Sequence, residues 1–313
     1  MRKTRSTSAF RLNLPATSAN LGPAFDAAAL AFDMHLSLEA RVASDDSIIA
    51  TGRDTDICGK LENHLILTTY REVMQAAGQP APALAIKIRN EIPIGKGCGS
   101  SAAARLAGIS LANHYGDLCW RDEQIVGEAS RREHHPDNAA ACWMGGITVA
   151  RMAGEAEAQI VRVHPKGNWP LLLAVPPDPL STEEARKVLP TQYSRADAVT
   201  NVQNSMLLLA AFIQGKPELL TNALEDRIHQ PYRARLCPLL PALGELAGTP
   251  GVLGVALSGA GPSVLMFLDP RVKTSAKRIA AQVAAHLDHK KLSAELFFTA
   301  IADRGAASVS SRR

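Results

Sequence analysis

The stretch IPIGKGCGSSAAARLAG, residues 92–108, carries the residue types best suited to chemistry in this chain. Its three glycines alternate with other residues, and two serines follow before a segment rich in alanine. Glycine adopts backbone conformations that other residues avoid, and it lets another group approach the chain closely. Where such a loop opens a helix, unpaired N–H groups and the helix dipole favour a bound anion. The stretch therefore predicts a phosphate-binding loop.

The spacing of this loop excludes the two best-known nucleotide loops. A Walker A loop has Lys and then Ser or Thr directly after its last glycine, whereas Lys96 lies between glycines. The dinucleotide fingerprint is G-x-G-x-x-G, whereas the three glycines here follow G-x-G-x-G and Ser100 comes next. A plainer interpretation stays open at this point, namely a tight strand-to-helix turn whose serines cap the helix.

Composition and charge narrow the class of protein. The 313 residues are 46% hydrophobic, which suits two domains of ordinary size. Lysine and arginine number 34 against 30 aspartates and glutamates, without a basic block, and 4% of residues are aromatic. This pattern predicts no nucleic-acid partner and suits an anionic small substrate.

Targeting signals are also missing from the sequence. The basic start, MRKTRSTSAF, lacks the apolar core of a signal peptide, and no stretch holds eighteen uninterrupted apolar residues. None of the five cysteines forms a C-x-x-C pair, which favours reduced thiols. We expect a cytoplasmic protein without a membrane partner.

Predicted strands and helices alternate irregularly along the chain. Residues 35–42 and 83–90 alternate like half-buried strands, and residues 62–78 between them have helical spacing. Because no regular βαβ period appears, we predict an α+β fold rather than a doubly wound sheet. The other predicted elements are helices at 100–114 and 121–132, strands at 145–152 and 158–165, a mostly helical region at 181–247, two strands joined by a glycine turn at 251–269, a helix at 272–287 and a strand at 294–302.

Three motifs in fixed order make the sequence resemble a known family. PIGKGCGSSAA, from Pro93 to Ala103, is similar to the phosphate loop P-x-G-x-G-x-G-S-S-A-A of the GHMP small-molecule kinases. That family is named for galactokinase, homoserine kinase, mevalonate kinase and phosphomevalonate kinase. LPATSANLGPAFD (Leu14–Asp26) resembles its first motif and LSGAGPSV (Leu257–Val264) its third, so the resemblance spans nearly the whole chain.

Shorter segments resemble the homoserine kinase branch of that family. These are HPDN ahead of a glycine pair, STEEAR and QPYR. The chain departs from the family pattern at Ala24, where glycine is usual, at residues 27–31 (AAALA), and at Cys98, where leucine is usual. The departures concern the backbone near Asp26 more than the chemistry.

The resemblance implies a two-domain α+β GHMP kinase fold. Residues 1–178 would form an ATP-binding domain like ribosomal protein S5 domain 2, and residues 179–313 a ferredoxin-like C-terminal domain. The implied reaction transfers the γ-phosphoryl group of ATP to the side-chain hydroxyl of L-homoserine, giving O-phospho-L-homoserine on the route to threonine. A homodimer is an assembly that family members often form. Two alternatives stay open: a kinase of the family that acts on another small alcohol, and a non-catalytic nucleotide-binding protein.

The resemblance also implies the ligands of ATP and Mg²⁺. Asn63 would lie near the adenine or ribose, with helix capping as its plain alternative. Ser101 and a glutamate on the following helix would bind Mg²⁺, which takes few oxygens from protein. Glu128 is favoured because it precedes His135 by seven residues, and Glu133 stays open. The residues predicted at the ATP phosphates are Pro93, Ile94, Gly95, Lys96, Gly97, Cys98, Gly99, Ser100, Ser101, Ala102 and Ala103.

Homoserine carries an ammonium, a carboxylate and a hydroxyl, so its site needs an anion, cations and a hydroxyl partner. A planar guanidinium can bind a carboxylate with two parallel hydrogen bonds. The resemblance assigns Asn20 and Asp26 to the ammonium, Arg186 and Arg233 to the carboxylate, and His135 and Asn138 to the hydroxyl end.

Asp137 and Asn138 are the residues predicted to act in catalysis. Asp137 matches in position the aspartate that acts as base in mevalonate-type relatives. Alternatively, Asp137 is structural, and the hydroxyl proton passes to phosphate oxygens after Asn138 has oriented the nucleophile. The segment SGAGPS, residues 258–263, reads as a glycine hairpin turn, and the resemblance implies that it packs beside the phosphate loop.

Overall fold

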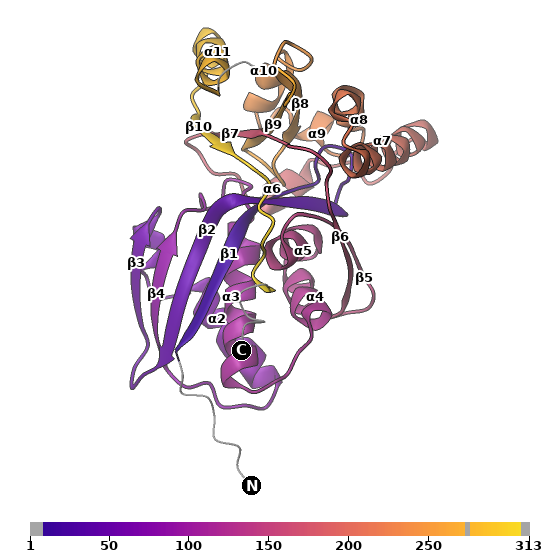
Figure 1. The fold of residues 1–313 in the computed structure, drawn as a ribbon. Helices are drawn as coiled ribbons and strands as arrows, with labels where there is room; N and C mark the ends of the chain where they lie inside the picture. Colours follow the sequence, from indigo (N-terminus) through magenta and orange to yellow (C-terminus); the bar gives the residue numbers. More distant parts are fainter. Residues whose placement is uncertain (1–8, 273–275, 308–313) are drawn as a thin grey trace.

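The computed structural model describes residues 9–272 and 276–307, which form two sheets with helices packed on them (Figure 1). The first sheet runs in the order β3-β4-β2-β5-β6, and β1 pairs with β2. All of its pairings are antiparallel except β3 with β4. Its strands are β1 (Phe10–Ala19), β2 (Ala28–Val42), β3 (Ser47–Gly52), β4 (Leu84–Asn90), β5 (Ile147–Met152) and β6 (Ala158–Val163).

The second sheet is antiparallel and runs in the order β10-β7-β9-β8. Strand β7 precedes the predicted domain boundary at residue 178 and yet belongs to this sheet, and the boundary itself stays a prediction. After β10 the chain returns to the first sheet, where Ile301 bridges to Phe32. The strands are β7 (Leu171–Val175), β8 (Val252–Leu257), β9 (Val264–Leu268) and β10 (Glu295–Thr299).

Helices of the N-terminal half cover one face of the first sheet (Figure 1). The central one, α3, begins directly after the glycine loop and is buried along most of its length. Its small residues permit this, because a Cβ on Gly108 would lie 2.5 Å from the carbonyl oxygen of Ile66. The helices are α1 (Thr55–Cys58), α2 (Leu65–Ala76), α3 (Ser100–Tyr115), α4 (Asp122–Glu133) and α5 (Asp137–Met144).

Helices also dominate the segment between β7 and β8, as predicted. Side-chain oxygens of Ser181 and Ser194 accept hydrogen bonds from backbone N–H groups at the starts of α6 and α7, which defines where these helices begin. The elements are α6 (Thr182–Lys187), α7 (Arg195–Gln214), a 3₁₀ turn (Pro217–Leu219), α8 (Leu220–Ala223), α9 (Gln230–Arg233), α10 (Leu239–Gly244) and, after β9, α11 (Ala276–His289).

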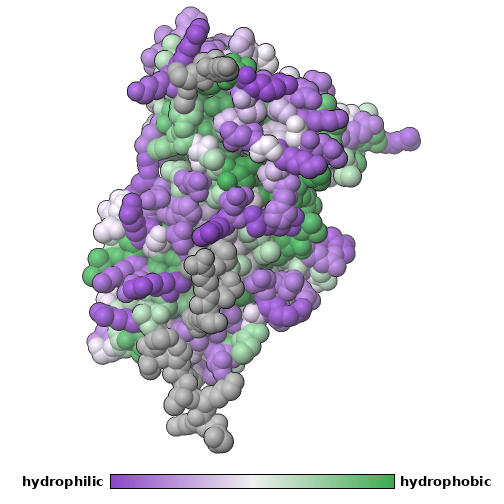
Figure 2. Space-filling view, in the orientation of Figure 1, coloured by the Kyte–Doolittle hydropathy of each residue, from purple (hydrophilic) through white to green (hydrophobic). Residues whose placement is uncertain are grey.

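Strand β1 is the main element that the sequence did not predict. Thr17 and Ser18 in it are fully buried, so polar and apolar residues do not alternate as they do in β4. The expectation for the first eight residues lies outside the described part of the chain. Within the described ranges, no helix is long and apolar enough to cross a membrane. The face seen in Figure 2 is mostly hydrophilic, with scattered hydrophobic patches.

The glycine loop packs against the turn that joins β8 and β9. Gly97 has φ 76°, and a Cβ there would lie 2.2 Å from the carbonyl oxygen of Ser258 and 2.6 Å from that of Gly261. The Ser258 hydroxyl donates a 2.8 Å hydrogen bond to the Gly97 carbonyl. The predicted packing of this turn beside the phosphate loop is thus confirmed.

This close approach makes Gly97 a test of the junction. We expect Gly97→Ala to lower the free energy of unfolding by about 2–4 kcal/mol, because left-handed strain adds to a backbone clash. Gly78→Ala is the matched control, since Gly78 has φ 64° and nothing within 4 Å of its added Cβ. Equilibrium denaturation of both variants makes the comparison. Equal losses would mean that the clash at Gly97 contributes nothing.

Candidate active site

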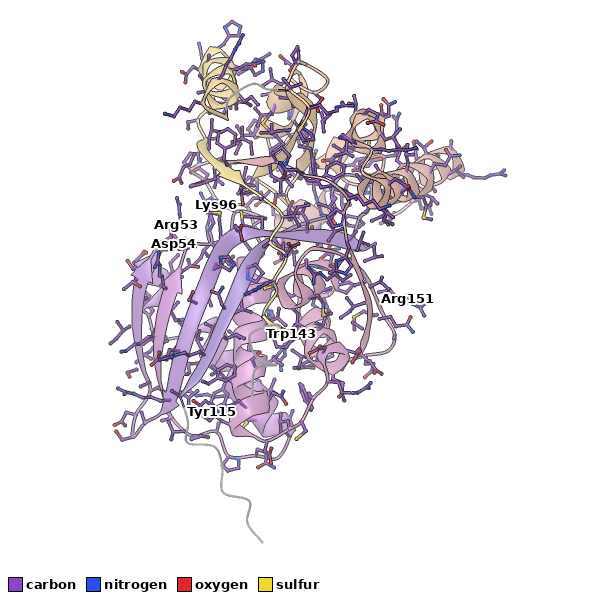
Figure 3. The ribbon with its side chains drawn as sticks, in the orientation of Figure 1. Arg53, Asp54, Lys96, Tyr115, Trp143 and Arg151 are labelled. Carbon is purple, nitrogen blue, oxygen red and sulfur yellow. The ribbon has the colours of Figure 1, made fainter. Side chains whose placement is uncertain are left out.

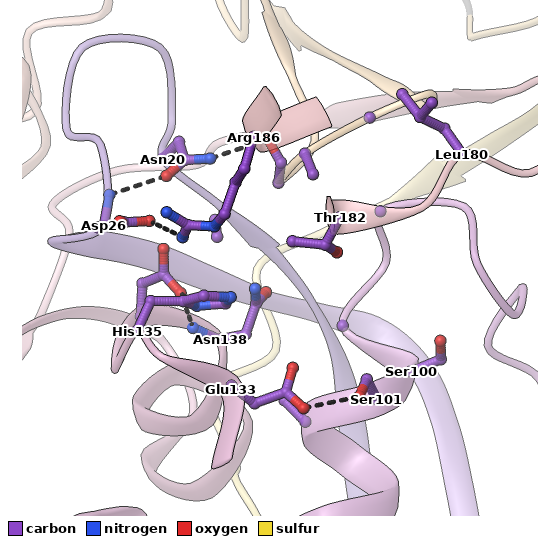
Figure 4. Close-up of a pocket in the computed structure, with 18 of the residues that line it drawn as sticks. Asn20, Asp26, Ser100, Ser101, Glu133, His135, Asn138, Leu180, Thr182 and Arg186 are labelled. Atoms are coloured by element: carbon purple, nitrogen blue, oxygen red, sulfur yellow. Dashed lines mark hydrogen bonds and ion pairs between the residues drawn. The ribbon is translucent and has the colours of Figure 1, made fainter. Parts of the chain in front are cut away.

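A polar cavity of about 100 Å³ lies where the two halves of the chain meet (Figure 4). Its walls come from the loop after β1, the glycine loop, the α4–α5 junction, α6, α9 and the turn at residues 259–261. Seven predicted substrate or catalytic residues line it, namely Asn20, Asp26, His135, Asp137, Asn138, Arg186 and Arg233. Residues far apart in sequence therefore share one cavity.

Asp26 and Arg186 pair with each other across this cavity. Arg186 Nη2 lies 2.7 Å from Asp26 Oδ1, and both side chains are about one-third exposed. Asn20 holds the loop in place, because its Oδ1 accepts from the Asp26 N–H and its Nδ2 donates to the Gly259 carbonyl. The structure thus engages the Asn20 amide with protein backbone and leaves the Asp26 carboxylate facing the cavity.

Arg233 is held from behind by a buried histidine. Its Nη1 lies 3.1 Å from His229 Nδ1, and its Nε donates to the Ala185 carbonyl at 3.0 Å. His229 is fully buried, and its Nε2 lies 2.7 Å from the carbonyl oxygen of Gly22. These contacts assign the His229 proton to Nε2, which leaves Nδ1 as the acceptor for Arg233. Burial lowers the pKa of His229 to about 4, so the ring is neutral at neutral pH.

Two guanidinium groups flank a single aromatic ring in this region. The guanidinium carbons of Arg186 and Arg233 lie 5.5 and 5.4 Å from the centre of the Phe25 ring. Burial, together with the charge of Arg186, lowers the pKa of Arg233 to about 10, so the group stays charged at neutral pH. The cavity therefore presents two cations beside the one carboxylate of Asp26.

The HPDN segment forms a hydrogen-bonded cluster on the opposite wall. His135 Nδ1 and the Asn138 N–H each lie 2.6 Å from Asp137 Oδ1. Asn138 Oδ1 accepts a 2.7 Å hydrogen bond from Thr17 Oγ1, which orients its amide. Burial opposes protonation of His135, but the hydrogen bond and charge of Asp137, with Asp26 and Glu133 nearby, raise its pKa above the usual range.

The structure corrects the predicted metal ligand from Glu128 to Glu133. Glu133 Oε1 lies 2.6 Å from Ser101 Oγ, and Glu133 lines the cavity. Glu128 is bonded to Arg131 and Arg132 instead. Burial opposes ionisation of Glu128, but these guanidinium groups outweigh it and lower its pKa. The spacing to His135 was misleading because the last turn of α4 turns Glu133 toward α3.

The donor set at Ser101 and Glu133 fits a magnesium ion. A carboxylate and a hydroxyl are oxygen ligands of the kind that Mg²⁺ accepts, and two protein ligands are the usual number beside phosphates and water. Both lie next to the first residues of α3, where backbone N–H groups favour anions. Arg105 Nε also contacts Glu133 Oε1, which holds this carboxylate in its ionised form.

A larger hollow of about 410 Å³ adjoins the cavity and contains Asn63. Gly95, Ser100 and Ser101 line both spaces, so the two communicate at the glycine loop. The walls of the hollow include the apolar side chains Ile57, Leu65, Ile66, Ile88 and Ile94. The capping alternative for Asn63 is wrong, because the residue at the N-cap of α2 is His64 and Asn63 has φ 53°.

Not every side chain of the glycine loop faces these spaces. Lys96 Nζ donates to the carbonyl oxygens of Pro176 and Pro177, beyond the end of β7, with Arg53 and Asp54 beside it (Figure 3). The Cys98 side chain is fully buried, and burial raises the pKa of its thiol to about 12. Pro93 lies beside Lys96, and Ala103 is buried, whereas Ala102 lines the cavity. The side chains of Lys96 and Cys98 therefore do not face a ligand in this structure.

Comparison with known proteins identifies the family. The models "GHMP kinases N terminal domain" and "GHMP kinases C terminal" match residues 64–146 and 208–289. A homoserine kinase from Solibacter usitatus is 44% identical over 264 residues, or 84% of this chain and 86% of that protein. One from Desulfitobacterium hafniense is 36% identical over 95% of this chain and 99% of that protein. The chain belongs to the homoserine kinases of the GHMP kinase family.

Solved structures agree on the fold. A homoserine kinase structure from Cytophaga hutchinsonii matches with a TM-score of 0.80 at 23% identity, over 97% of this chain and 99% of that one. Leishmania major mevalonate kinase, "in complex with R-mevalonate", matches with a TM-score of 0.69 at 14% identity, over 97% and 99%. At these identities they show the fold alone. The predicted two-domain α+β GHMP kinase fold is confirmed, and the chain is a kinase.

This homoserine kinase also uses residues that the sequence did not single out. His229 stands directly before QPYR and four residues before Arg233, a spacing that places both on one side of a short helix. Thr17 lies within the first motif, and Phe25 directly precedes Asp26. The His229 spacing was a usable signal, whereas nothing in the sequence pairs Thr17 with Asn138.

The buried His229 gives the protein a specific pH dependence. Its pKa is about 4 when folded and about 6.5 when unfolded, so the unfolded chain binds the extra proton between these values. The free energy of unfolding should therefore fall as the pH drops from about 6.5 toward 4. We expect His229→Gln, which removes the titrating ring, to flatten this slope in denaturant titrations across that range. Parallel curves for the variant and the wild type would contradict the assignment.

Proposed function

We propose that the chain transfers the γ-phosphoryl group of ATP to the side-chain hydroxyl of L-homoserine, giving O-phospho-L-homoserine in threonine biosynthesis. The observation that carries the proposal is the pairing of Asp26 with Arg186, next to Arg233, inside a cavity that opens onto the glycine loop. One carboxylate and two guanidinium groups complement the zwitterion of an amino acid. The small volume of the cavity suits a small substrate.

Substrate binding would replace the Asp26–Arg186 ion pair with two new ones. The ammonium of homoserine would pair with Asp26, and its carboxylate with Arg186 and Arg233. The exchange keeps every charge in the cavity compensated, which matters because an unpaired charge in a partly buried site is costly. Asn20 and His229 would keep Asp26 and Arg233 in place during the exchange.

The hydroxyl end would lie against the HPDN segment. Asn138, oriented by Thr17, would hold the hydroxyl toward the glycine loop, and phosphoryl transfer depends chiefly on such positioning. Asp137 Oδ1 is already bonded to His135 and to the Asn138 N–H, which favours a structural part for this carboxylate. We propose that the hydroxyl proton passes to phosphate oxygens.

The nucleotide would occupy the larger hollow, with its phosphates at the glycine loop. Asn63 and the apolar walls would surround the adenosine, and backbone N–H groups at the start of α3 would bind the phosphates. Ser101 and Glu133 would hold Mg²⁺, which neutralises phosphate charge when bound. We further propose that the enzyme works in the cytoplasm, where ATP is available and its five free cysteines stay reduced.

The two alternatives are less well supported. A kinase for a sugar or another uncharged alcohol would have no use for Arg186 and Arg233 in the cavity. A non-catalytic nucleotide-binding protein would not need Asp26, His135 and Asn138 gathered beside the phosphate loop. The homoserine kinase relatives also favour neither alternative.

The first prediction concerns the two arginines. Arg186→Lys and Arg233→Lys should each raise the homoserine KM and lower kcat/KM at least tenfold, because lysine keeps the charge and loses the paired donors. This corresponds to about 1.5–3 kcal/mol, the usual value of a hydrogen bond to a charged group. The ATP KM should stay close to that of the wild type. Steady-state kinetics with each substrate varied in turn makes the measurement.

Two analogues separate the two ends of the substrate. 3-Amino-1-propanol lacks the carboxylate, so it should be a poor substrate whose turnover changes little in either arginine variant. 4-Hydroxybutanoate lacks the ammonium, so Asp26→Asn should harm it less than it harms homoserine. If the arginine variants lose equal activity on homoserine and on 3-amino-1-propanol, the arginines do not bind the carboxylate and the proposed substrate loses its main physical support.

The second prediction compares the two glutamates of α4. Glu133→Gln should lower kcat strongly and raise the Mg²⁺ concentration needed for half-maximal activity, because it removes a charged oxygen ligand. Glu128→Gln makes the same chemical change and should leave both quantities near wild type, because Glu128 faces Arg131 and Arg132. Kinetics over a range of Mg²⁺ concentrations tests both variants. The reverse order of effects would return the metal to Glu128.

A further inference from the structure

Helix α7 carries a stripe of exposed apolar side chains on the side away from the body of the protein. Five of the eleven exposed large hydrophobic residues among those described lie on this one helix, which projects from the second half of the molecule (Figure 1). Val202 and Met206 are 63% and 66% exposed. Contiguous exposed apolar surface of this kind marks a contact site. The stripe consists of Val199, Val202, Met206, Ala210 and Ile213.

The stripe lies opposite the buried face of the same helix. At 3.6 residues per turn, its members fall within one narrow sector, and Asn201, Leu208 and Phe212 fall about half a turn away. Those three residues are buried in the protein. The stripe is therefore not the edge of the core but a second, separate apolar face.

The spacing of the stripe is symmetric about Met206. Its members are separated by three, four, four and three residues. If a second copy of the helix runs antiparallel with the twofold axis at Met206, Val199 of one copy meets Ile213 of the other. Val202 then meets Ala210, and Met206 meets itself. Such a self-complementary patch is what a twofold homodimer interface requires, and methionine adapts well to the crowded axis.

The charges at the ends of α7 agree with the same arrangement. Arg195 and Asp197 lie in the first turn, and residues 198–215 contain no charged side chain. In the antiparallel pair, Asp197 lies near Lys216 of the second copy, just past the end of its helix. Arg195 lies near the carboxyl end of that helix, where a cation is favoured. A parallel pair would instead place like charges together.

We propose that α7 pairs with α7 of a second copy of this chain, antiparallel and centred on Met206. One face of a 20-residue helix is about 30 Å long and about 10 Å wide, which is small for a stable dimer. The dimer is therefore reversible in the micromolar range. The opposite face of α7 supports the cavity, since Asn201 Nδ2 and Ser205 Oγ both donate to the Pro23 carbonyl in the Asp26 loop.

Sedimentation velocity of the full chain from low to high micromolar concentration tests the pairing. We expect a monomer–dimer equilibrium for the wild type and a monomer throughout for Met206→Glu, because the two carboxylates would face each other at the axis. Ile49→Glu is the matched control, since Ile49 is 62% exposed on β3, and it should dimerise like the wild type. Equal thermal unfolding of both variants shows that they are folded. A wild type that stays monomeric, or a Met206→Glu variant that still dimerises, would overturn the proposal.

Cross-linking tests the register in a Cys119→Ser background, because the other four cysteines are buried. Met206→Cys should form a covalent dimer under an added oxidant, since a disulfide needs Cβ atoms about 4 Å apart. A mixture of Val199→Cys and Ile213→Cys copies should cross-link to each other rather than to themselves. Ile49→Cys should give no dimer. Preferred Val199–Val199 cross-links would indicate a parallel pair and overturn the arrangement.

Discussion

The close approach of Gly97 to the carbonyl oxygens of Ser258 and Gly261 is the constraint on which the site depends. Neither half of the chain forms the cavity alone: one supplies the glycine loop, Asp26 and the HPDN segment, and the other supplies Arg186 and Arg233. A side chain at residue 97 would separate the two backbones. Because the backbones touch, the phosphate loop and the two guanidinium groups lie on facing walls of one small space.

Electrostatic compensation governs that space. Asp26 pairs with Arg186, Arg233 is backed by a neutral imidazole, and Glu133 contacts Arg105. A protonated His229 would place a second buried cation against Arg233, so its low pKa follows from the same burial that orders the guanidinium. Each group that faces the cavity is thus held by a partner that does not, and ligands can exchange partners without exposing a bare charge.

Motifs with local geometry were predictable from the sequence, and long-range contacts were not. The glycine loop, the helix after it and the paired strands β5 and β6 follow from spacing and alternation, which are properties of neighbouring residues. Strand β1 escaped because its buried Thr17 and Ser18 break the alternation. Glu128 was preferred over Glu133 because sequence spacing says nothing about which side of the last helical turn faces Ser101. Only packing against α3 decides that.

Helix α7 joins the two levels of organisation. Its inner face holds the Pro23 carbonyl through Asn201 and Ser205, and thereby the loop that presents Asp26 to the cavity. Asn201 Oδ1 also accepts from the Arg227 N–H, near the start of the segment that leads to His229 and Arg233. One helix therefore braces both the anionic and the cationic ends of the cavity. Any surface that steadies α7 from outside, as a second copy would, steadies the groups that compensate each other inside.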